Sequence, residues 1–171
     1  VELHLHTAYS FLDGASLPEE LIGRAADLGY QALAITDHDG LYGAMEFARL
    51  AHDVSIQPIT GAEVTLIDGS HLTLIALNRT GYANLCRLIT AAHRVGRADR
   101  APRLDPALLP SHAEGLVLLT GCRQSKLAQL VDAGRYREAE QLVREYVTWF
   151  SPEHVIVELQ HNLVFGDTER V

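Results

Sequence analysis

The chain has 171 residues, of which 47% are hydrophobic and 21% are charged, so its composition excludes both a disordered and a fibrous protein. A chain of this length forms about one domain with a sizeable core. The net charge is -8, from 14 basic and 22 acidic residues. This balance argues against a broad duplex-binding face, although a local arginine patch could still contact a phosphodiester.

The cysteine pattern and the hydropathy predict a soluble protein of the cytoplasm. Cys86 and Cys122 lie far apart with no C-x-x-C spacing, which predicts neither a disulfide framework nor a structural zinc site. No apolar run approaches the roughly 20 residues that span a bilayer, and no leader sequence is visible, so we expect no membrane partner. The charged final residues carry no stop signal, which indicates a piece of a longer protein.

The N-terminal stretch, residues 1–16, begins with an alternating apolar run that predicts a strand. His4 and His6 are two residues apart, so they would lie on the same face of this strand. Asp13 follows in a turn before Gly14, where a carboxylate can fold back towards both imidazoles. Such a set suits zinc, manganese or iron. For a single His-x-His, one hydrogen-bonded and one solvated histidine explain the pattern equally well.

Helices and short buried strands alternate along the rest of the chain. Apolar spacing and capping signals predict helices over 17–28, 43–52, 80–93, 125–133 and 136–150. Apolar runs predict strands over 32–35, 56–66, 71–77, 116–119 and 155–159, the second of them interrupted at Gly61. Asp68 and Gly69 form a hairpin-type turn, and 96–110 is a loop with a helical turn near its end. This alternation predicts an α/β fold with a parallel sheet or barrel.

Polar residues follow several of the predicted strands. In a parallel barrel the carboxyl ends of all strands open on one face, so residues distant in sequence converge there. A cluster with donors for two or more divalent ions would combine His4, His6, Asp13, His38 and Glu63. Asp37 and His38 are the candidate catalytic residues, and Asp37 either binds an ion or orients its histidine neighbour.

Other polar residues are weaker candidates. His71 lies at the start of its strand, where position alone predicts a surface or structural role, and Cys122 is either a soft ligand or a small buried residue. A phosphate could be bound by Arg97, Arg100, Arg103 or Arg123. No phosphate-binding glycine loop, nucleophile elbow or cysteine protease pattern is present, which leaves metal-assisted hydrolysis as the predicted chemistry.

Four motifs in order, His-Leu-His-Thr, Thr-Asp-His-Asp-Gly, Gly-Ala-Glu and Thr-Gly-Cys, resemble those of the PHP (polymerase and histidinol phosphatase) domain family. The resemblance covers essentially all 171 residues. It is closest to the N-terminal PHP domain of bacterial C-family DNA polymerases, nearest the error-prone branch, through HLHTAYSFLDGAS, AITDHDGLYGAMEFA, GAEVTL, HLTLIALNRTGYANLCRLITAAHR, LLTGC and VELQHN.

This resemblance implies a distorted (β/α)7 TIM-like barrel with a metal site at the strand ends. The family site binds up to three ions, here zinc, manganese or iron. By motif, the ligand role is carried over to His4, His6, Asp13, His38, Glu63, His71 and Cys122. For His71 the resemblance therefore reverses the interpretation drawn from position. The family's last Asp-x-His motif does not follow Gln160, so we expect the domain over 1–171 to lack its closing strands and up to two ligands.

The resemblance also implies a metal-dependent phosphoesterase or 3′–5′ exonuclease in an error-prone DNA polymerase. Its partners would be a DNA 3′ end or single strand, the rest of the polymerase chain, and other replication or damage-tolerance proteins. Two alternatives stay open: a free-standing phosphatase on a small phosphomonoester, and a catalytically silent scaffold. The HLTLIALNRTGYANL stretch disfavours the first, and the metal-competent ligand residues disfavour the second.

Overall fold

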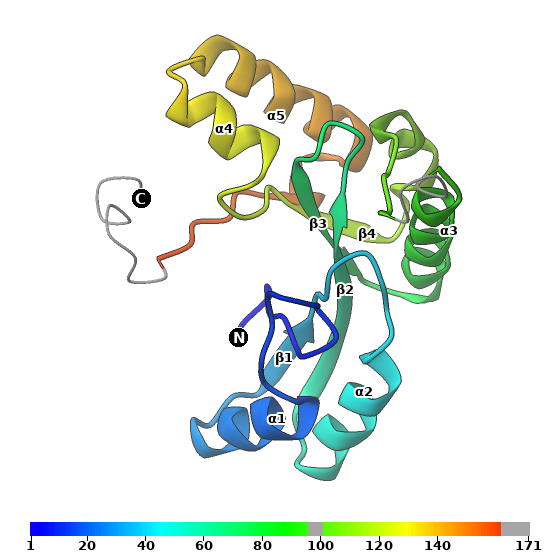
Figure 1. Ribbon diagram of the computed structural model, residues 1–171, viewed down its shortest axis with the longest axis vertical. Coiled ribbons are helices and arrows are strands. Elements are labelled where there is room, and N and C mark those ends of the chain that lie inside the picture. Colours follow the sequence, from blue (N-terminus) through cyan, green and yellow to red (C-terminus); the bar gives the residue numbers. More distant parts are fainter. Residues whose placement is uncertain (96–100, 162–171) are drawn as a thin grey trace.

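One five-stranded sheet runs through the described part of the molecule, which is residues 1–95 and 101–161 of a computed structural model (Figure 1). The strand order is β1-β2-β3-β4-β5. The strands are β1 (Ala32–Ile35), β2 (Gln57–Thr65), β3 (His71–Ala76), β4 (Leu116–Leu119) and β5 (Val155–Ile156). The helices are α1 (Pro18–Asp27), α2 (Ala44–Asp53), α3 (Arg79–Val95), α4 (Lys126–Asp132) and α5 (Tyr136–Phe150). No described helix is long and apolar enough to span a membrane.

The sheet is mixed. The outer pairs β1·β2 and β4·β5 are parallel, whereas β2·β3 and β3·β4 are antiparallel. The hairpin turn predicted at Asp68 and Gly69 joins β2 to β3, with Gly69 at φ +82° and the Leu66 N–H donating to the Ser70 carbonyl. The α/β prediction is confirmed, with the difference that the middle of the sheet is antiparallel.

Strand β2 changes its partner at Gly61. Residues up to Thr60 pair with β1, and residues from Gly61 onward pair with β3. A Cβ at position 61 would lie 2.6 Å from the Leu74 carbonyl oxygen, so only glycine permits this close approach of the two backbones. The predicted interruption at Gly61 is therefore a change of partner within one continuous strand.

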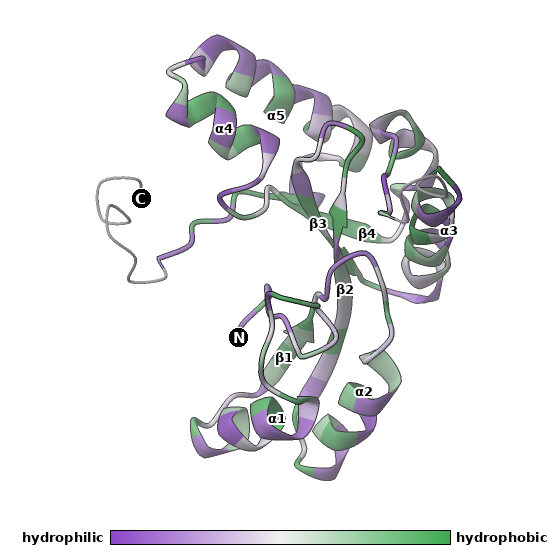
Figure 2. Cartoon of the chain, viewed as in Figure 1, coloured by the Kyte–Doolittle hydropathy of each residue, from purple (hydrophilic) through white to green (hydrophobic). Residues whose placement is uncertain are grey.

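This change of partner divides the described structure into two lobes. The first lobe packs α1 and α2 on β1, around a core that includes Phe47 and Ile35. The second lobe packs α3 and α5 against β3 and β4, around Leu72, Leu85 and other buried side chains. In Figure 1 the first lobe is the lower half and the second lobe the upper half, and β2 runs between them. The hydrophobic colour of β4 in Figure 2 agrees with the burial of all four of its residues.

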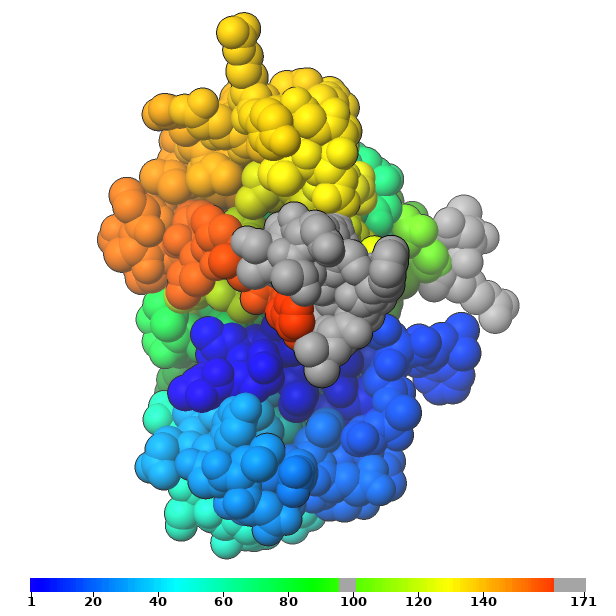
Figure 3. Space-filling model, turned by 90° about the vertical axis from the view of Figure 1, so that its left-hand side faces the viewer, coloured from blue at the N-terminus to red at the C-terminus, as the bar shows by residue number. Residues whose placement is uncertain are grey.

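The N-terminal segment lies between the two lobes, as the dark blue band in Figure 3 shows. The strand predicted here is wrong as a regular element: the segment is extended beside β1 but makes a single bridge, between Glu2 and Leu33. Two backbone hydrogen bonds, Ala34 N–H to the Glu2 carbonyl and Thr36 N–H to the Leu5 carbonyl, fix its position. The segment thus delivers its histidines to the junction of the lobes.

The remaining elements follow the sequence prediction closely. The helical turn expected after the loop is a 3₁₀ turn over Pro106–Leu108, whose N-cap Asp105 accepts a hydrogen bond from the Ala107 N–H. Residues 96–100 of the predicted loop lie outside the described residues. Strand β5 ends at Ile156, three residues before the predicted end, and Glu158 beyond it donates its N–H to the Thr120 hydroxyl.

Candidate metal centre

All seven predicted ligands line one cavity of about 390 Å³ at the junction of the lobes. The cavity is lined by His4, His6, Asp13, His38, Glu63, His71, Cys122, Arg123, Gln124 and Gln160. The sheet brings them together because His38 follows β1, Glu63 lies on β2 and Cys122 follows β4. A parallel bridge between His38 and Glu63 extends the β1·β2 pairing to the edge of the cavity. The predicted convergence of distant residues is present in the structure.

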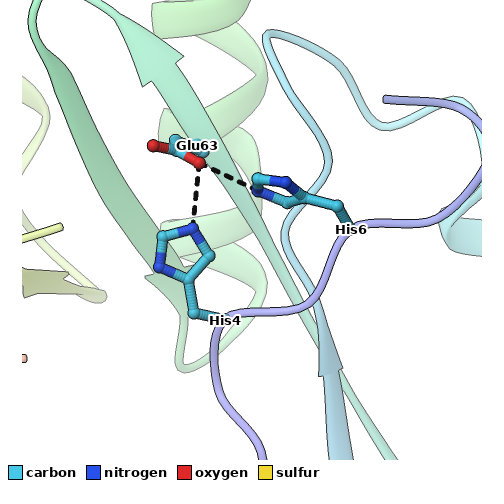
Figure 4. A group of neighbouring side chains, drawn as sticks. All are labelled: His4, His6 and Glu63. Carbon is cyan, nitrogen blue, oxygen red and sulfur yellow. Dashed lines mark hydrogen bonds and ion pairs between the residues drawn. The ribbon is translucent and has the colours of Figure 1, made fainter. Parts of the chain in front are cut away.

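Glu63 is the centre of this cluster. Its side chain is fully buried, and its Oε2 atom lies 2.9 Å from His4 Nε2 and 2.8 Å from His6 Nε2. Figure 4 shows these two contacts. Its Oε1 atom lies 2.8 Å from His71 Nδ1 and accepts a hydrogen bond from the Cys122 thiol. Burial alone would raise the pKa of Glu63, but the hydrogen bonds to the histidines outweigh burial and lower it well below its usual range. Glu63 is therefore an ionised carboxylate inside the protein.

Asp13 forms the solvent-facing side of the cluster. Its Oδ2 atom is hydrogen-bonded to His6 Nδ1 and lies 3.2 Å from His38 Nε2. Burial alone would raise the pKa of Asp13, but the hydrogen bonds to the two histidines lower it. The carboxylate is half exposed, so it meets both the imidazoles and water.

His71 reaches the cluster because β3 runs antiparallel to β2. In a hairpin, the first residues of the second strand lie at the same edge of the sheet as the last residues of the first, and His71 pairs with Thr65. The surface role predicted from the position of His71 at a strand start assumed that the strands are parallel, and β3 is antiparallel to β2. The contact with Glu63 follows from the strand direction.

Glu158 is a member of the cluster that the sequence reasoning missed. Its Oε1 atom lies 2.6 Å from His4 Nδ1 and accepts a hydrogen bond from the Gln160 amide, while its Oε2 atom is buried without a hydrogen-bond partner in the described residues. Burial alone would lower the pKa of His4, but the bonds to Glu158 and Glu63 raise it to about 10. An acidic residue just after the last strand would have indicated Glu158 as a site residue, but the predicted strand over 155–159 included it.

Asp37 lies behind the cluster and does not line the cavity. Its buried carboxylate accepts hydrogen bonds from the Thr7 N–H (2.7 Å), the Thr7 hydroxyl (2.8 Å) and the Ser10 hydroxyl (2.6 Å). Ser10 in turn accepts a hydrogen bond from the His38 N–H. The geometry therefore gives no support to Asp37 as a catalytic residue, because its carboxylate holds the turn that carries His6 and Asp13.

The same turn requires a glycine at position 14. A Cβ there would lie 1.9 Å from the Thr7 carbonyl oxygen, an overlap that no side chain could make. The backbone closes further through Ser10 N–H to the Thr7 carbonyl and Gly14 N–H to the Ser10 carbonyl. Asp13 is thus held in a fixed turn, as the Asp-Gly pair in the sequence indicated.

The predicted phosphate-binding arginines are separated by the structure. Arg123 lines the cavity, whereas Arg103 donates to the Pro102 carbonyl and is not among the lining residues. Arg97 and Arg100 lie outside the described residues. Of the described candidates, Arg123 alone reaches the cluster.

The donor set fits divalent metal ions. Three overlapping groups have ligand atoms within 4.8 Å of one another: His4, His6 and Glu63; His6, Asp13 and His38; His38, Glu63 and His71. Two buried polar atoms, His6 Nε2 and Glu158 Oε2, have no hydrogen-bond partner among the described residues, although His6 Nε2 lies 2.8 Å from Glu63 Oε2. Imidazole and carboxylate donors suit zinc, manganese and iron. Burial raises the pKa of the nearby Cys122 thiol to about 12, and the Glu63 carboxylate adds to this shift.

Comparison with known proteins assigns the family. The model of the PHP domain matches residues 2–162. An error-prone DNA polymerase of Symbiobacterium thermophilum is 45% identical over 98% of this chain and 17% of its own length. A DNA polymerase III subunit alpha of Treponema pallidum is 38% identical over 94% of the chain and 15% of its own length.

The chain therefore spans about one sixth of the length of these relatives. Among solved structures, an amidohydrolase from Chromobacterium violaceum with bound sulfate is 33% identical, with a TM-score of 0.47, over 57% of this chain and 34% of its own. The family model and the long alignments agree with the motifs and with the α/β fold. This chain belongs to the PHP domain family.

Proposed function

We propose that this chain is the PHP domain of an error-prone DNA polymerase and hydrolyses the terminal phosphodiester at the 3′ end of a single DNA strand. The observation that carries the proposal is the cavity in which three overlapping donor groups share Glu63, His6 and His38. Two or more ions held side by side match the chemistry of phosphodiester displacement. We propose up to three ions, because there are three donor groups.

The ligand residues would be His4, His6, Asp13, His38, Glu63 and His71, with Cys122 and Glu158 at the border. A divalent ion bound there supplies Lewis acidity towards the phosphoryl oxygens and lowers the pKa of water. In the reaction, a water oxygen bonds to phosphorus, the bond from phosphorus to the 3′ oxygen breaks, and a nucleoside 5′-monophosphate leaves. The freed 3′ oxygen takes up a proton. Asp13, half exposed, would hold an ion at the solvent-facing side of the cluster, and the attacking water would give its proton to the solvent there.

The relatives named error-prone DNA polymerase support the proposed partners and cellular role. Error-prone polymerases align over nearly the whole chain, including one from Mycobacterium tuberculosis at 42% identity. The partners would be a DNA 3′ end and the remaining polymerase chain, and the cellular role would be synthesis across damage in the cytoplasm. A free-standing phosphatase and a silent scaffold are the competing functions that the experiment must separate.

The test uses the full-length protein and a Glu63→Gln variant. We expect bound metal in the wild type by elemental analysis and trimming of a 3′-labelled single strand. In Glu63→Gln, metal content and the rate of trimming should each fall by at least about tenfold, because the substitution removes the negative charge that the surrounding histidines and the ions contact. Glu19→Gln is the matched control, since Glu19 is an exposed acid on α1. Hydrolysis of p-nitrophenyl phosphate without trimming would favour the phosphatase, and neither metal nor turnover would favour the scaffold.

A further inference from the structure

A second hollow adjoins the metal-site cavity. It has a volume of about 180 Å³ and lies between α4 and the segment after β5. The two spaces share three lining residues, Cys122, Arg123 and Gln160. The hollow therefore borders the metal-site cavity at these three residues.

The walls of this hollow are mainly apolar. Helix α4 contributes Leu127, Ala128 and Val131, and the segment after β5 contributes Val157 and Leu159. Two hydroxyls of the lining are already engaged, since the Ser125 hydroxyl accepts from the Ala128 N–H and the Thr120 hydroxyl accepts from the Glu158 N–H. The two acids that also line the hollow, Asp132 and Glu158, disfavour an anion there. The hollow therefore favours an apolar or flat aromatic group over an anionic one.

Arg123 supplies the positive charge at the junction. It is exposed, has no hydrogen bond or ion pair within the described residues, and is the one lysine or arginine that lines either space. The nearby Lys126, by contrast, is paired with Asp68 at 2.9 Å. The cavity carries the carboxylates of Asp13 and Glu63, so a phosphate entering it benefits from an uncommitted guanidinium at the entrance.

We propose that Arg123 and the adjoining hollow form the recognition subsite for the 3′-terminal nucleotide. Arg123 binds a non-bridging oxygen of the scissile phosphate, and the hollow takes the terminal base. At about 180 Å³ the hollow is smaller than typical drug-sized pockets of roughly 300–1,000 Å³ and suits one base rather than a base pair. A paired terminal base must leave its stack before it enters, so the subsite selects frayed or mismatched ends. This inference rests on the proposed function and names its substrate determinants.

The experiment compares two single strands in the full-length protein, one with a normal 3′-terminal nucleotide and one whose terminal nucleotide lacks the base. We expect the wild type to prefer the normal end by roughly tenfold or more in kcat/KM, as one stacked base contributes. Val131→Asp should bring this ratio close to one, because it places a charge in the hollow. Val131 is 42% exposed, so the variant should fold, and Val54→Asp, at a 44% exposed position in the first lobe, is its control.

The arginine is tested separately. Arg123→Ala should lower kcat/KM on both strands by roughly tenfold or more, and Arg123→Lys should restore part of the loss. The control is Arg137→Ala, which removes an exposed arginine on α5. If the wild type trims the strands but the base preference is absent or survives Val131→Asp, the inference is overturned while the proposed function stands.

A binding measurement distinguishes failure of the proposed function from failure of the subsite inference. If the wild type trims neither strand, the proposed function falls, and calorimetric titration with a deoxynucleoside 5′-monophosphate and with deoxyribose 5-phosphate still tests the subsite. Tighter binding of the nucleotide that Val131→Asp abolishes supports the inference. Equal binding of both compounds overturns it.

Discussion

Replacing Asp37 by asparagine should loosen the turn that carries Asp13 without touching the reacting groups. The Asp37 carboxylate accepts three hydrogen bonds from Thr7 and Ser10, and all of these groups are buried. In the variant, an amide NH₂ replaces one acceptor, so the Thr7 hydroxyl can no longer donate to residue 37, and the bonds from the Thr7 N–H and the Ser10 hydroxyl lose the help of the charge. One lost bond to a charged group costs about 1.5–3 kcal/mol.

Hydrogen exchange of the turn measures this cost. The backbone N–H groups of Thr7, Ser10, Asp13 and Gly14 are all hydrogen-bonded in the native turn. If the turn opens locally, their exchange in Asp37→Asn should be about 10- to 150-fold faster than in the wild type. Metal content should fall with it, since the turn positions Asp13. The control is Asp27→Asn, an exposed acid at the end of α1.

A catalytic role for Asp37 would give a different result. Trimming would then be lost while exchange of the turn and metal content stayed at wild-type levels. That combination would refute the positioning role derived from the hydrogen bonds. Loss of all three together supports it.

Two further predictions concern stability. Burial alone would raise the pKa of Asp68, but hydrogen bonds from Lys126 and Ser70 lower it to about 2, so its stabilising effect is present above the unfolded value near 4 and is lost as pH falls towards 2. Asp68→Asn should therefore destabilise the protein at pH 7, by less than about 1 kcal/mol because the pair is exposed, and the difference in urea denaturation should shrink below pH 4. Gly81→Ala should destabilise by about 1–3 kcal/mol or more, because its Cβ would lie 1.8 Å from a carbonyl oxygen; unchanged thermal unfolding would contradict this. Gly23→Ala, in open space on α1, should stabilise by about 0.5–1 kcal/mol and is the control.

Local signals were sufficient to predict most elements. The apolar spacing over 17–28 and 125–133 and the apolar run over Ala32–Ile35 each depend on neighbouring residues, and the structure has α1, α4 and β1 where those patterns place them. Strand direction is different, because it depends on pairing between distant residues. The hairpin turn indicated one antiparallel pair, but nothing local indicated that β4 would also run antiparallel to β3.

The residues of the site divide in the same way, into those that local strand signals indicated and those whose place depends on strand direction or strand length. His38 lies three residues after the end of β1, and the rule for strand ends identified it. Cys122 lies three residues after the end of β4, but its position left a ligand and a small buried residue both open, and the family resemblance made it a predicted ligand. His71 violates that rule because the hairpin reverses its strand, and only the family resemblance identified it. Glu158 was missed because the apolar pattern extended the last strand over it, whereas β5 in fact ends at Ile156. For Asp37 the sequence left an ion-binding and an orienting role open, because sequence adjacency to His38 does not determine which way its side chain points, and the structure places its carboxylate behind the cluster.

The change of partner at Gly61 makes the two lobes thermodynamically interdependent. His38 follows a strand of the first lobe, and His4, His6 and Asp13 come from the N-terminal segment between the lobes. His71, Cys122 and Glu158 come from the second lobe, and Glu63 lies on the strand that both lobes share. Whatever binds all of these side chains at once ties the opening of one lobe to the opening of the other. A destabilising substitution in the core around Phe47, in the first lobe, should thus weaken the binding of a ligand that His71 contacts in the second lobe.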